Sequence, residues 1–138
     1  MLNVYFAIAA NRVIVDSISN QVSIIDLFEQ LKAPSFPVLV PRLTLLYYVS
    51  RDKGDPATKD LMVVCKLGET EICKVAVTVD FKAEDSTRIV LGIDGLTLTE
   101  PGMFQAYLMD QDVSLGVLDL AVEQAKTTDS VASLSISH

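Results

Sequence analysis

The sequence lacks most of the residues on which catalytic chemistry depends. It contains no tryptophan and a single histidine, His138, which is the last residue. No Ser-His-Asp or Cys-His arrangement is available, and zinc has no set of imidazole ligands. Neither glycine-rich phosphate loop, G-x-G-x-x-G or G-x-x-x-x-G-K-[ST], occurs. We therefore predict a protein that is not an enzyme and holds no cofactor. Only a carboxylate mechanism such as glycoside hydrolysis stays open, because it needs just two carboxyl groups roughly 5–10 Å apart.

Basic residues and long apolar runs are also scarce. Eleven Lys and Arg stand against eighteen Asp and Glu, which gives a net charge of −7, and the basic residues are scattered along the chain. Binding to nucleic acid or to an anionic membrane requires clustered positive charge, so neither is expected as a partner. No apolar run approaches the roughly 18–20 residues that cross a bilayer.

The chain has only two cysteines, and their state follows from the expected compartment. The opening stretch MLNVYFAIAANRVIVD contains an A-x-A pattern, but no Lys or Arg precedes its short apolar part, so a signal peptide is not expected. A cytoplasmic location follows, where thiols stay reduced. Cys65 and Cys73 are then expected to pack as small hydrophobic side chains. A disulfide or a redox switch between them is the alternative.

What the sequence does contain is apolar material in a strand-like pattern. Half of the 138 residues are hydrophobic. Residues 1–126 fit one domain of ordinary size, and the small, polar residues 127–138 are expected to form a flexible tail. Apolar and polar residues alternate in several segments, which is typical of half-buried strands. These segments are 3–10, 43–50, 61–67, 73–79, 88–99, 103–110 and 115–122.

Breaks between these segments indicate turns and crossovers. The stretch 22–31 is ambiguous: its β-branched start favours a strand, whereas DLFEQLK is compatible with a short helix, and we predict a strand. Pro34, Pro37 and Pro41 follow, and they predict an extended crossover from one sheet to another. Gly68 marks a β-hairpin. Pro101 and Gly102 mark a corner that delivers Phe104 to the core, which is a scaffold feature rather than a site.

Seven or eight short strands separated by turns predict an all-β fold. The architecture expected is an antiparallel β-sandwich with Ig-like, C2-like or jelly-roll topology. The sequence does not decide among these strand orders.

Acidic loops provide the one candidate metal site. If successive strands run up and down, several loops emerge at the same end of the sandwich. Calcium binds six to eight oxygen atoms, and such loops supply carboxylates. The candidate ligands are Asp52, Asp55, Asp85, Asp110 and Asp112. Lysines and arginines in the same loops oppose this interpretation, and acidic loops are more often solvated turns.

One strand carries apolar residues toward both of its faces. In LLYYV, Tyr47 alternates with Leu46 and Tyr48. If one face of the sheet is uncovered, Leu46 and Tyr48 belong to an interaction patch. If a second sheet or the crossover covers it, they are core residues.

The segments VSIIDLFEQLKAPSFP, residues 22–37, and LTEPGMFQAYLMD, residues 98–110, resemble a family of small uncharacterised β-sandwich proteins from bacteria and their phages. Asp26 stands where that family frequently has glycine, and Phe104 replaces a common tyrosine. The resemblance implies a β-sandwich and transfers no catalytic residue. The function expected is therefore a non-catalytic interaction or structural module that contacts another protein or another copy of itself. The alternative is a calcium- or small-ligand-binding module that uses the acidic loops.

Overall fold

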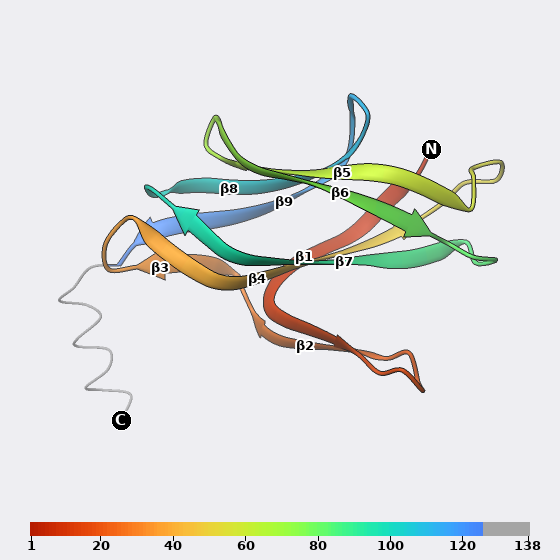
Figure 1. Ribbon diagram of the computed structural model, residues 1–138, viewed down its shortest axis with the longest axis horizontal. Helices are drawn as coiled ribbons and strands as arrows, with labels where there is room; N and C mark the ends of the chain where they lie inside the picture. Colours follow the sequence, from red (N-terminus) through yellow and green to blue (C-terminus); the bar gives the residue numbers. More distant parts are fainter. Residues whose placement is uncertain (126–138) are drawn as a thin grey trace.

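The computed structural model describes residues 1–125, which form two stacked β-sheets (Figure 1). Sheet A contains, in spatial order, β2 (Val22–Leu27), β1 (Asn3–Val15), β4 (Val38–Ser50) and β7 (Ser86–Leu98). Sheet B contains β3 (Gln30–Ala33), β9 (Val113–Gln124), β8 (Gly102–Asp110), β5 (Thr58–Leu67) and β6 (Thr70–Asp80). The all-β fold and its two sheets agree with the prediction. The predicted tail at 127–138 lies outside the described residues.

The described chain has nine strands rather than seven or eight, because the stretch 22–31 is divided. β2 ends at Leu27 in sheet A, and β3 begins at Gln30 in sheet B. Asp26 has a positive φ of 54°, which a regular strand does not tolerate, and the Phe28 amide bonds to the Ala9 carbonyl at 2.8 Å. β3 then pairs with β9 in parallel, whereas the other neighbouring strands are antiparallel.

The predicted connections between the sheets are largely confirmed. The segment after β3 that contains Pro34 and Pro37 returns the chain from sheet B to β4 of sheet A. Pro41, by contrast, lies inside β4, at a position beyond the paired part of β1, so its missing amide costs no bond to that strand. The Pro101–Gly102 corner joins β7 of sheet A to β8 of sheet B, and Phe104 is completely buried.

The core lies between the sheets and is crossed by one buried hydrogen bond. Tyr47 of β4 is fully buried, and its hydroxyl donates to the carbonyl oxygen of Ala106 in β8 at 2.9 Å. Burial also raises the pKa of the Tyr47 hydroxyl, so it stays protonated as a donor. Around it pack alternate residues of the facing strands, among them Leu45, Val63 and Phe104.

No helix of the described residues is long and apolar enough to cross a membrane.

Replacing Tyr47 by Phe should lower the free energy of unfolding by about 0.5–1.5 kcal/mol, because the bond between the two sheets is lost. Tyr47→Ala should cost about 3–5 kcal/mol, since it also leaves a cavity. Urea denaturation measures both values. Tyr5→Phe, at a ring that is 59% exposed, is the matched control with no expected loss. Equal stability of Tyr47→Phe and the native protein would contradict the role assigned to this bond.

Candidate functional site

The most unusual surface of the molecule is the far part of the β1–β2 hairpin, residues 11–27, here called the hairpin arm. Beyond Ala10, β1 leaves its pairing with β4, and the arm turns back below sheet A (Figure 1). Fourteen large hydrophobic side chains are exposed among the described residues, and six of them belong to the arm. The six are Ile14, Val15, Ile18, Ile24, Ile25 and Leu27. Ile18, in the turn, is 95% exposed.

Two contacts hold the arm against the outer faces of β4 and β7. At its base, the Thr44 hydroxyl of β4 donates to the Asn11 carbonyl oxygen at 3.1 Å. At its tip, an Nη2 donor of Arg88 in β7 bonds to the Asn20 carbonyl oxygen at 3.0 Å and also to the Asn20 Oδ1. β7 and β2 are opposite edges of sheet A. The Arg88 contact therefore shows that the arm crosses the outer face of the sheet.

This covering changes the roles predicted for Leu46 and Tyr48. Leu46 is completely buried but does not belong to the core between the sheets, so it lies inside the monomer and is not available to a partner. The arm, which bonds to Thr44 and Arg88, lies on that side of β4. Tyr48 is half-buried, with ring-centroid distances of 5.5 Å to Phe6 and 6.1 Å to Tyr5. In register, Tyr48 pairs with Arg88, so these aromatics adjoin the anchored tip of the arm.

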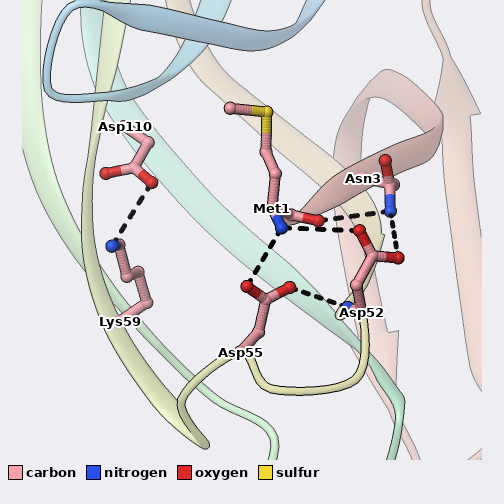
Figure 2. Close-up of polar contacts among 6 residues, drawn as sticks. All are labelled: Met1, Asn3, Asp52, Asp55, Lys59 and Asp110. Carbon is pink, nitrogen blue, oxygen red and sulfur yellow. Dashed lines mark hydrogen bonds and ion pairs between the residues drawn. The ribbon is translucent and has the colours of Figure 1, made fainter.

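The candidate calcium ligands are divided among separate partners. Asp52 and Asp55 lie on either side of the Met1 ammonium, at 3.4 and 3.0 Å (Figure 2). The Asp52 amide also donates to Asp55 Oδ2 at 2.7 Å, and Asn3 Nδ2 donates to Asp52 Oδ1 at 3.1 Å. The Asp52 amide, followed by the ammonium, holds the pKa of Asp55 below its usual range. Asp55 in turn raises the pKa of the ammonium.

The remaining candidates lie elsewhere. Asp110 forms an ion pair with Lys59 at 3.4 Å (Figure 2). Asp85 is held through its carbonyl oxygen, which accepts from the Arg51 amide at 2.9 Å. Asp112 lines a separate surface on sheet B. Within residues 1–125, no group of three or more His, Cys, Asp or Glu side chains is arranged to hold a metal ion. The calcium hypothesis therefore gains no support from this geometry.

Cys65 and Cys73 face each other across the β5–β6 hairpin. Its turn contains Gly68 and Glu69, because Leu67 pairs with Thr70, and a bulge follows Cys65. Both cysteines are free thiols. Burial, and then the neighbouring Cys73, raise the pKa of the Cys65 thiol, so it is a poor nucleophile.

Sequence reasoning missed a second surface, a trough of about 830 Å³ on the outer face of sheet B. Its apolar floor includes Met62, Val64, Tyr107 and Met109, which pair across β5 and β8. The β5–β6 and β8–β9 turns rise above sheet B at opposite ends (Figure 1). The available signal was β5 itself, where Met62 and Val64 are apolar on the face opposite the core.

The polar rim of the trough is unevenly charged. Lys66 and Lys74 lie toward the β5–β6 turn, with Glu71 beside them, and Asp60 and Asp112 lie toward the β8–β9 turn. The Lys66 ammonium lies 5.5 Å from the centre of the Tyr107 ring.

Comparison with known families gives a match over most of the chain. The model of DUF6941, a family of unknown function, matches residues 5–123. Among curated proteins, none matches this sequence significantly.

Adding calcium should leave the melting temperature unchanged, because Asp52, Asp55 and Asp110 already have cationic partners. Differential scanning fluorimetry with and without calcium checks this. A calcium-dependent rise that disappears in the Asp110→Asn, Asp112→Asn double variant would restore the calcium hypothesis.

Removing the anchor at the tip should loosen the arm without unfolding the sandwich. In Arg88→Ala, backbone amides of the arm should exchange with deuterium several-fold faster, while the urea midpoint stays nearly the same. Hydrogen-exchange mass spectrometry reports both the arm and the core. Arg42→Ala, an exposed arginine on the same sheet, is the control. Unchanged exchange in the arm would show that Arg88 does not hold it.

Proposed function

Since the chain belongs to DUF6941, a family of unknown function, we propose a function from its own geometry. The protein is a non-catalytic interaction module whose contact surface is the hairpin arm. The observation that carries this proposal is the gathering of exposed apolar side chains on residues 11–27. Exposed apolar residues are ordinary when scattered, but a contiguous group of them marks a contact surface.

The arm also has the energetics of a binding element. Full burial of an Ile side chain contributes about 1.5–3 kcal/mol. Ile18 is 95% exposed, whereas Ile14 and Ile24 are 44% and 42% exposed, so a partner that covers them gains most of that free energy at Ile18 and less than half of it at each of the other two. The exposed parts of these side chains contribute little to the stability of the monomer, because they are not removed from water. The contact at Arg88 keeps the arm in one place, which lowers the entropy lost on binding.

The proposal includes a cytoplasmic location. The two free thiols, Cys65 and Cys73, support it, because reduced cysteines are typical of that compartment.

The Ile18→Ser, Ile24→Ser double variant should lose its binding partner with only a small loss of stability, because Ile18 is 95% exposed and Ile24 is 42% exposed. Native and variant protein are immobilised, exposed to an extract of the cells that produce the protein, and compared by quantitative mass spectrometry. Leu39→Ser, at a side chain that is 59% exposed outside the arm, is the matched control. Retention of the same proteins by all three baits would contradict an arm-mediated function.

A further inference from the structure

We propose that the hairpin arm of one copy docks into the trough on sheet B of a second copy, so that the protein assembles with itself head to tail. This inference rests on the proposed function and names the partner. It commits to one occupant of the trough, which is the arm of an identical chain.

The two surfaces lie on opposite sides of the molecule. The arm lies below sheet A (Figure 1). The trough residues Met62 and Val64 alternate with the buried core residues of β5, so the trough is on the face of sheet B that points away from sheet A. A contact between two different surfaces of identical subunits is heterologous. It repeats from copy to copy and produces rings or filaments rather than a closed two-fold dimer. The arm is exposed at its turn, so it can enter a trough without leaving its own sheet.

Two exposed charges on the arm have opposite signs, as the two ends of the trough do, and Asp26, beside Arg12 in the register, partly offsets the positive one. Arg12, Ile14 and Asp16 are all exposed, and the two charges are four residues apart, about 13 Å in an extended strand. The Ile18 amide bonds to Asp16 Oδ1 at 2.9 Å and, as the largest cause, lowers the pKa of Asp16, which stays ionised.

The trough presents lysines at one end and aspartates at the other. Lys74 of β6 pairs with Val64, so it lies four residues from Asp60 along β5, about 13 Å, which is the spacing of Arg12 and Asp16. Lys66 lies two residues farther along β5. We place Asp16 of the incoming arm toward Lys66 and Lys74, and Arg12 toward Asp60 and Asp112. Ile14, which lies between the two charges, then meets the apolar floor at Met62 and Tyr107.

The charges invoked are available for such contacts. Within residues 1–125, none of Arg12, Lys66, Lys74 and Asp112 forms a salt bridge. Asp60 accepts one hydrogen bond, from the Thr78 hydroxyl at 2.8 Å, and keeps its other oxygen open. Glu71 lies beside the two lysines and offsets part of their positive charge, so that end of the trough keeps a net charge of one positive unit.

The experiment is a charge exchange between two variants of the purified chain. One variant carries Asp16→Lys on the arm, and the other carries Lys66→Glu and Lys74→Glu in the trough. Mass is measured by light scattering across a concentration series at low salt. The average molar mass of the native protein should rise above the 15.0 kDa of the monomer as its concentration increases. Each variant alone should associate at least tenfold more weakly, and an equimolar mixture should recover the native behaviour.

Recovery of association in the mixture distinguishes a loss of docking from misfolding of a variant. A misfolded turn in Asp16→Lys is not repaired by a trough of opposite charge, whereas a reversed ion pair is. Glu100→Lys, an exposed charge in the β7–β8 corner, is the control and should associate like the native chain.

Three results overturn the inference: a native protein that stays monomeric at every concentration, association that neither variant weakens, or losses that mixing does not restore. A strict monomer whose capture of another protein still requires Ile18 and Ile24 would leave the proposed function standing and make self-assembly wrong. The trough then takes a different ligand.

Discussion

The Tyr47 hydroxyl bond to the Ala106 carbonyl sets the relation between the two sheets, on which every other feature depends. Apolar packing between sheets is not directional, so it resists sliding only weakly. A buried donor has one acceptor within reach and loses free energy wherever that acceptor is missing. The bond joins β4, in the interior of sheet A, to β8, in the interior of sheet B. It therefore fixes which residues of the two inner faces meet.

The inner faces are committed to the core, so the outer faces of the two sheets are exposed to contacts with other molecules. On sheet A the chain bends back and covers its own strand, which buries Leu46 and turns β4 into a strand that is apolar on both sides. The covering hairpin then exposes its own apolar residues. On sheet B, Met62 and Tyr107 remain at the floor of an open trough. The molecule thus has a projecting apolar surface on one side and a concave one on the other.

In the acidic loops, carboxylates that were candidate calcium ligands pair with cations of the chain itself. Asp52 and Asp55 are neighbours in sequence and in space, but the ammonium of Met1 occupies the position between them. Asp110 is balanced by Lys59. These three carboxylates are each balanced by a nearby cation, and that arrangement does not gather the six or more oxygen atoms that calcium requires.

Local pattern determined much of the fold. Alternation located most of the strands, Gly68 located a hairpin, and the Pro101–Gly102 corner located a change of sheet, because each of these depends on a few adjacent residues. The division of 22–31 between two sheets was not foreseen, since no local pattern shows that Leu27 stays paired with β1 while Gln30 already pairs with β9. The return of the arm to Arg88 joins residues 68 positions apart, and the trough joins β5, β6 and β8. Only tertiary structure decides such contacts, because the alternation that makes a strand says which side chains share a face but not what will cover that face.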